Sequence, residues 1–157
     1  MEKLLNEIMD LSFKELQHAQ QILKLTQEIR VCIEKEKVKT LNQVLNLRQQ
    51  WINQAEDTRK KIQEKTKELE SRYSKRIEEI NAKLYNHSQV ENIFKNKEQR
   101  KKIYRYIYEL EMENLPKAEN LLKQYRNKIN GLQQGKKVIQ VYEKRSTTPS
   151  ILLNQLK

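Results

Sequence analysis

Residues 2–36 read EKLLNEIMDLSFKELQHAQQILKLTQEIRVCIEKE. Apolar or small side chains recur in this stretch at steps of three and four, which keeps one face of a helix turned toward a partner helix. This stripe consists of Leu5, Ile8, Ser12, Leu16, Ala19, Ile22, Thr26, Ile29 and Ile33. A flanking row, which widens the face, consists of Leu4, Leu11, Leu25 and Cys32. We therefore predict a long helix over about 2–36 that packs against two neighbours.

The same spacing continues along two further stretches and predicts helices over about 41–85 and 89–130. The second stripe consists of Leu41, Leu45, Arg48, Ile52, Ala55, Arg59, Ile62, Thr66, Leu69, Tyr73, Ile77, Ile80 and Leu84. The third consists of Val90, Ile93, Lys97, Arg100, Ile103, Ile107, Leu110, Asn114, Ala118, Leu121, Tyr125, Ile129 and Leu132. Polar seam residues such as Arg48, Arg59 and Thr66 fix the register of packed helices at some cost in stability. Trp51, beside the second stripe, is expected to anchor packing against a neighbour.

Two capping boxes mark the turns between these helices. Thr40 is followed three positions later by Gln43, and Ser88 is followed by Glu91. In this motif the hydroxyl accepts from a backbone N–H, and the longer side chain reaches back to the cap. We predict turns at about Lys37–Thr40 and Tyr85–Ser88, with one continuous helix through the second position as the alternative.

The C-terminal part of the chain carries the helix-breaking residues. Pro116 falls inside the third stretch, where it either kinks the helix or ends it with Asn114 as the next cap. Gly131 and Gly135 are the only glycines, and they favour a helix end or a hinge. We therefore expect residues 1–130 to form the helical body and residues 131–157 to form a flexible or short helical tail.

The composition points to an all-α protein. There are two glycines and two prolines among 157 residues, whereas proteins made of short strands need turn residues every ~8–12 positions. Disorder is the rival interpretation of a chain with 34% charged residues, but the helical periodicity argues against it. The predicted architecture is an elongated antiparallel bundle of three long, coiled-coil-like helices.

The sequence offers little for catalysis, metals or cofactors. His18 and His87 lie far apart and in no metal-ligand spacing. The single cysteine, Cys32, lies on the apolar side of the first helix and is expected to be a small core residue. We expect no enzyme, no catalytic or metal site and no cofactor. A lone cysteine and the absence of apolar runs near the ~18 residues that a span requires favour a cytoplasmic protein.

The net charge of +11 is concentrated toward the C-terminus. Residues 88–157 hold fifteen basic and seven acidic side chains, which gives +8. Basic residues gather in Lys95–Arg105, and tyrosines 104, 106 and 108 follow closely. Such a pattern can bind nucleic acid through phosphate pairing and base stacking. Helical spacing places Tyr106 away from Tyr104 and Tyr108, so the tyrosines are not expected to form one platform, and nucleic-acid binding is the less favoured alternative.

Residues 22–58, ILKLTQEIRVCIEKEKVKTLNQVLNLRQQWINQAEDT, resemble the core of the FlgN/FliT-type flagellar export chaperones. In that family a first helix ends in a charged stretch, a turn follows, and the next helix opens with leucines and an Arg-Gln pair. The matching positions here are Ile29, Ile33, Glu34, Leu41, Leu45, Arg48, Gln49 and Ile52. Residues 135–150, GKKVIQVYEKRSTTPS, resemble the end of such proteins, with Tyr142 at the position of a family tyrosine. The long second and third helices and the positive charge look more like the export stalk component FliJ.

The resemblance implies a binding function. Such chaperones keep a flagellar axial protein, of the hook-associated or filament-cap type, from assembling early and deliver it to an export-gate component. The implied client-binding residues are Leu121, Leu122, Tyr125, Ile129, Leu132, Val138 and Ile139. Tyr142 is the implied docking residue for the gate, and the tail is expected to cover the client site until a client displaces it. The alternatives are a coiled-coil stalk of the export ATPase and a basic nucleic-acid-binding coiled coil. The sequence leaves open whether the chain forms a homodimer.

Overall fold

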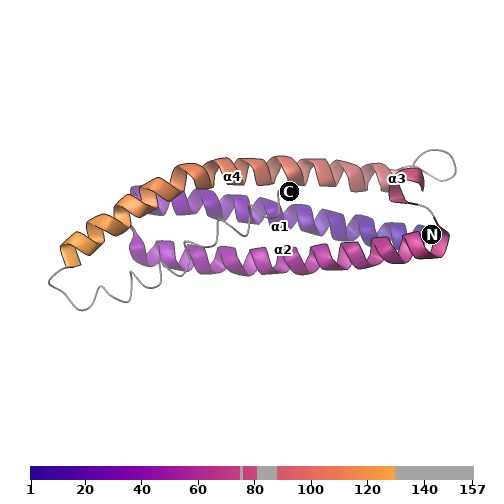
Figure 1. Ribbon diagram of the computed structural model, residues 1–157, viewed down its shortest axis with the longest axis horizontal. Coiled ribbons are helices and arrows are strands. Elements are labelled where there is room, and N and C mark those ends of the chain that lie inside the picture. Colours follow the sequence, from indigo (N-terminus) through magenta and orange to yellow (C-terminus); the bar gives the residue numbers. More distant parts are fainter. Residues whose placement is uncertain (75, 81–87, 130–157) are drawn as a thin grey trace. The chain divides into compact units, whose positions relative to one another are not determined.

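The computed structural model describes residues 1–74, 76–80 and 88–129, and nearly all of these are helical (Figure 1). The four helices are α1 (Glu2–Glu34), α2 (Val38–Tyr73), α3 (Ile77–Ile80) and α4 (Ser88–Ile129). No strand occurs within these ranges. The all-α class is therefore confirmed. The predicted tail, residues 131–157, lies outside the described part of the chain.

The turn between α1 and α2 comes earlier than the capping box predicts. Glu36 has a left-handed backbone, with φ of 51°. Its N–H donates to the carbonyl of Ile33 at 3.1 Å, and the N–H of Lys37 donates to the carbonyl of Cys32 at 2.9 Å. These two bonds form a Schellman motif, which satisfies the last carbonyls of a helix. Because α2 already begins at Val38, Thr40 lies inside the helix, and its assignment as an N-cap is wrong.

The second helix is shorter than predicted. It ends at Tyr73, and Ser74 has a φ of 49°. A left-handed residue breaks the repeating helical hydrogen bonds, so the prediction of one helix to about residue 85 is wrong. The one-turn helix α3 follows, and the Arg76 N–H donates to Glu79 Oε2 at 3.3 Å. Residues 81–87, which hold most of the predicted second turn, are outside the described ranges, and α4 begins one residue before the predicted start.

Pro116 does not interrupt α4, which is helical on both sides of it. Asn114 is buried inside this helix, so the alternative in which one helix ends at Pro116 and Asn114 caps the next is wrong. Pro116 itself is exposed, and its missing N–H removes one backbone hydrogen bond of the helix. The packing of the surrounding residues outweighs this loss.

The chain divides into two compact units. The described residues of unit 1 fall within Met1–Gln20 and Ile52–Ile103, and those of unit 2 fall within Gln21–Trp51 and Tyr104–Ile129. The core of unit 1 joins the start of α1 to the end of α2, α3 and the start of α4. Its buried members are Leu4, Leu5, Ile8, Leu69, Ile77, Val90 and Ile93.

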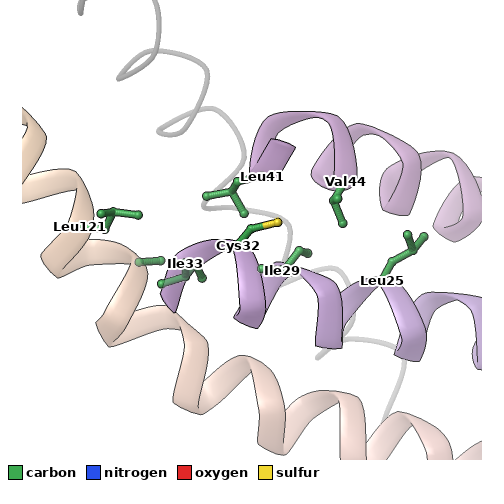
Figure 2. Close-up of a cluster of buried hydrophobic side chains, with 8 residues drawn as sticks. Leu25, Ile29, Cys32, Ile33, Leu41, Val44 and Leu121 are labelled. Atoms are coloured by element: carbon green, nitrogen blue, oxygen red, sulfur yellow. The ribbon is translucent and has the colours of Figure 1, made fainter. Parts of the chain in front are cut away.

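The core of unit 2 joins the end of α1, the start of α2 and the second half of α4. Its buried members are Leu25, Ile29, Cys32, Ile33, Leu41, Val44, Ala118 and Leu121. Figure 2 shows these side chains on the facing sides of the three helices. Cys32 is a core residue, as predicted, and burial raises the pKa of its thiol. Trp51 packs against this cluster from its edge.

Every residue of the predicted α1 stripe is buried. Full burial of one large apolar side chain contributes about 1.5–3 kcal/mol, so this stripe is a main source of stability in both units.

The ion pairs between α1 and α2 show the relative direction of these two helices within unit 1. Glu7 pairs with Lys65 at 2.8 Å, whereas Glu15, further along α1, pairs with the earlier residue Arg59 at 3.0 Å. Here α1 and α2 therefore run in opposite directions.

Residues further along α1 contact residues further along α4. In unit 1, Gln89 donates to Asn6 at 2.7 Å and Asn96 donates to Ser12 at 3.0 Å. In unit 2, Arg30 pairs with Glu113 at 3.0 Å, and Lys117 pairs with Glu34 at 3.5 Å. In each unit α1 and α4 therefore run in the same direction.

Candidate binding surface and buried polar pairs

A carboxylate held by two arginines interrupts the apolar core of unit 1. Glu15 is almost fully buried, and it accepts from Arg59 Nε at 3.0 Å and from Arg100 Nη1. One residue from each of α1, α2 and α4 thus meets in a single polar layer. Arginine suits this role because its planar fork of donors can bind a carboxylate and extend to another group.

A second polar layer lies in unit 2. Arg48 of α2 pairs with Glu111 of α4, and the side chains are only 4% and 5% exposed. Close by in sequence, Asn114 Nδ2 donates to the backbone carbonyl of Thr26 at 3.4 Å. Burial raises the pKa of the Glu111 carboxyl, and the Arg48 guanidinium opposes this rise. A buried charge without its partner is costly, so this layer permits few alternative alignments of α2 and α4.

The sequence predicted the arginines of these layers but not their acidic partners. Arg48 and Arg59 interrupt an apolar stripe, and this marks them as seam residues. Glu15 and Glu111 lie beside the stripe positions Leu16 and Leu110, where an acid is usually exposed. The signal that identifies them is chemical, because a buried arginine requires a carboxylate on a facing helix.

The end of α4 continues past the turn between α1 and α2 within unit 2 (Figure 1). Lys117 is level with the end of α1, because it pairs with Glu34, and α4 extends another twelve residues to Ile129. We call residues 118–129 the α4 extension. Leu121 is buried in the unit 2 core, whereas Leu122 is half-buried.

Tyr125 belongs to the same extension and is half-buried at the edge of the unit 2 core. The Nζ atom of Lys128 lies 5.9 Å from the centre of its ring. Ile129 is the last residue of α4. The structure thus places Leu121, Leu122 and Tyr125 together, while Leu132, Val138, Ile139 and Tyr142 lie outside the described residues.

The α4 extension has a positive charge. It holds Lys123, Arg126 and Lys128 against Glu119, which gives +2. Lysine and arginine near the C-terminus of a helix are stabilised by the helix dipole. A surface with these features combines an apolar edge with an electrostatic preference for acidic partners.

The tyrosines near the basic cluster do not share one surface. Tyr104 is 3% exposed and belongs to the core, whereas Tyr106 is 46% exposed, and Tyr108 is half-buried. This agrees with the predicted absence of a single stacking platform. The described helices therefore offer no row of exposed tyrosines for stacked bases.

The described residues contain no group of three or more His, Cys, Asp or Glu side chains arranged to hold a metal ion. His18 is 4% exposed, and burial lowers the pKa of its imidazole.

Among residues 1–74, 76–80 and 88–129, no helix has an apolar stretch long enough to cross a bilayer.

Similarity to known proteins does not assign this chain to a family. Comparison with protein-family models, with curated proteins and with solved structures gives no match for this chain. The described residues thus characterise the chain as a helical protein with two buried polar layers and a basic, partly apolar extension of α4.

Proposed function

We propose that this chain is a non-catalytic binding protein that holds an amphipathic helix of a partner protein on the α4 extension. The observation that carries the proposal is the position of Leu122 and Tyr125. Tyr125 packs against the edge of the unit 2 core, and Leu122, one helical turn before it, is half-buried. Both belong to the part of α4 that continues past the turn between α1 and α2 (Figure 1). An added helix can pack its apolar face against this edge and so continue the core.

The charge of the extension favours a partner helix with acidic residues beside its apolar face. Lys123, Arg126 and Lys128 are exposed, so they can pair with such residues without a large desolvation cost. Pairs of this kind contribute mainly to the association rate and to specificity. The apolar contacts then supply most of the affinity.

The specific form of the proposal follows from the resemblance to the FlgN/FliT-type chaperones. The partner is the terminal helix of a flagellar axial protein, and binding shields that helix until export through the gate. In this form of the proposal, Leu132, Val138 and Ile139 extend the binding surface and Tyr142 contacts the gate. The cytoplasm is the compartment in which such a chaperone works.

We further propose that α1, α2 and α4 form one antiparallel bundle along their whole length. The support is that α4 runs in the same direction as α1 in each unit, while α2 runs against α1 in unit 1. An up-down-up order of this kind is common in helix bundles.

The test is calorimetry of the full chain against synthetic terminal helices of flagellar axial proteins from the same cell. We expect saturable binding that Leu122→Glu and Tyr125→Glu each weaken at least tenfold, because each places a charge in the apolar contact. Gln124→Glu is the matched control, because Gln124 is exposed on the same helical turn and gains the same charge. Equal affinity of all three variants would place the site elsewhere. If no axial helix binds, the chaperone role is excluded.

A further inference from the structure

Unit 1 contains a hollow of about 290 Å³ among α1, α2, α3 and α4. Five apolar side chains form much of its wall: Ile8, Ile62, Ile77, Ile93 and Phe94. A volume of this size lies at the lower limit of ligand sites, which range over ~300–1,000 Å³. It is also far larger than the ~30 Å³ share of one water molecule in the liquid, so the hollow has room for a small organic molecule.

Cationic groups line the hollow alongside this apolar wall. The lining includes three cationic side chains, Arg59, Lys97 and Arg100. It also includes two carboxylates, Glu15 and Glu78, so the formal charge of the lining is +1. The Nζ atom of Lys97 lies 5.9 Å from the centre of the Phe94 ring. This places an ammonium group next to the apolar wall.

Arg100 supplies a second cation on the same side of α4, one turn after Lys97. Its Nη1 atom pairs with Glu15, and its side chain is 20% exposed. A guanidinium has five N–H donors, so one contact with Glu15 leaves donor capacity for a further anion. The buried Glu15 holds this guanidinium at the hollow, and its orientation therefore does not depend on a ligand.

We propose that this hollow binds a small amphiphilic anion, namely a carboxylate that bears a short alkyl chain. The carboxylate lies between Lys97 and Arg100, and the chain lies among Ile8, Ile62 and Ile93. Charge-assisted hydrogen bonds from these cations fix the head group, and removal of the chain from water supplies the larger part of the affinity. The site is distinct from the α4 extension and does not depend on the function proposed for it.

The experiment is calorimetry of the full chain with octanoate, and two related molecules separate the contributions of charge and chain. Octan-1-ol has the chain without the charge, and butyrate has the charge without most of the chain. We expect octanoate to bind saturably at one site, and both comparison molecules to bind at least tenfold more weakly. Equal affinity for octanol would show an apolar cavity without anion recognition. Absence of saturable binding of octanoate would overturn the proposal.

Two pairs of variants locate the site. Lys97→Gln should weaken octanoate binding about three- to tenfold. Lys101→Gln, which removes the same charge from the exposed Lys101 outside the lining of the hollow, should not. Ile62→Trp fills the hollow from the half-buried Ile62 and should abolish binding, whereas Val31→Trp, at an exposed site in unit 2, should not. Helix content of each variant is checked by circular dichroism. If Ile62→Trp stays folded and binds octanoate normally, the ligand does not occupy this hollow.

Discussion

Arg48 and Glu111 form an ion pair that is buried among apolar residues. Desolvation of both charges offsets much of their attraction, so such a pair adds little net stability. Its effect is strongly asymmetric, because the loss of one partner leaves the other charged and unpaired. The main contribution of the pair is therefore to the alignment of α2 with α4.

This asymmetry predicts the result of a double-mutant cycle on the pair. Glu111→Leu alone should lower the free energy of unfolding by about 3–5 kcal/mol, because it leaves Arg48 buried without its carboxylate. Arg48→Met combined with Glu111→Leu should be neutral or more stable than the original chain. Urea denaturation measures both quantities, provided that unfolding has two states. A double variant as unstable as the single one would contradict this account.

His18 gives unit 1 a stability that depends on pH. Burial lowers the pKa of its imidazole, Lys14 lowers it further, and Glu15 opposes the change. The unfolded chain therefore binds this proton more readily than the folded chain. The stability due to His18 is present above the unfolded pKa of ~6.5 and is lost as the pH falls through the folded pKa.

The measurement is the free energy of unfolding between about pH 5.5 and pH 7.5, a window set by the ~6.5 reference pKa. It is made in a His87→Gln background, so that only one histidine titrates. His18→Gln should flatten the decline in stability toward low pH, because its side chain is neutral throughout. An unchanged slope would mean that other groups cause the pH dependence.

At the scale of the element, the end of α1 contains an unfavourable backbone conformation. Glu36 has the left-handed conformation that a Schellman motif requires, and a residue with a Cβ adopts it at a cost of roughly 1–2 kcal/mol. Glycine adopts this conformation without that cost.

Glu36→Gly should therefore raise the free energy of unfolding by about 0.5–1 kcal/mol, which is smaller than the conformational cost because glycine also increases the entropy of the unfolded chain. Lys35→Gly is the control, because Lys35 does not have a positive φ; it should be neutral or destabilising. Thermal and urea denaturation of the two variants provide the comparison. If both glycines have the same effect, the left-handed backbone of Glu36 is not a source of strain.

At the scale of the whole molecule, the proposed bundle predicts an extended particle. A continuous helix of 42 residues, such as α4, is ~63 Å long at ~1.5 Å per residue. A globular chain of 157 residues has a radius of gyration near ~15 Å. Small-angle scattering should give a clearly larger radius and a maximum dimension of at least ~63 Å. A radius near the globular value would contradict one bundle along the full helices.

The sequence was informative wherever periodicity alone decided the outcome. The α1 stripe was predicted in full, because each of its members faces the core of a unit. The break at Ser74 was missed because it has neither glycine nor proline, and the left-handed conformation there depends on packing beyond the local sequence. Glu15 and Glu111 were missed for a similar reason, since periodicity records apolar positions and not the partners of buried charges.

Helical periodicity predicts only part of the candidate binding surface. A stripe that extends along α4 cannot distinguish Leu121, which is buried in unit 2, from Leu122, which is half-buried. That distinction depends on where the neighbouring helices end, and a single stripe does not contain this information. The hollow in unit 1 is a property of three packed helices and the short α3, and no single segment predicts it.

The separation in sequence between α1 and α4 has a consequence for synthesis of the protein. Asn6 and its hydrogen-bond partner Gln89 are separated by 83 positions in the sequence, and Thr26 and its partner Asn114 by 88. At ~5–20 residues per second, the ribosome needs roughly 4–18 s to supply these partners. Arg59 follows Glu15 by only 44 residues, so α2 can cover one side of α1 in about half that time. The side of α1 that faces α4 therefore has no partner helix until α4 has been made, whether or not α2 already covers the other side. A pause in translation before Ser88 would lengthen the time for which this apolar surface can aggregate or bind a ribosome-associated chaperone.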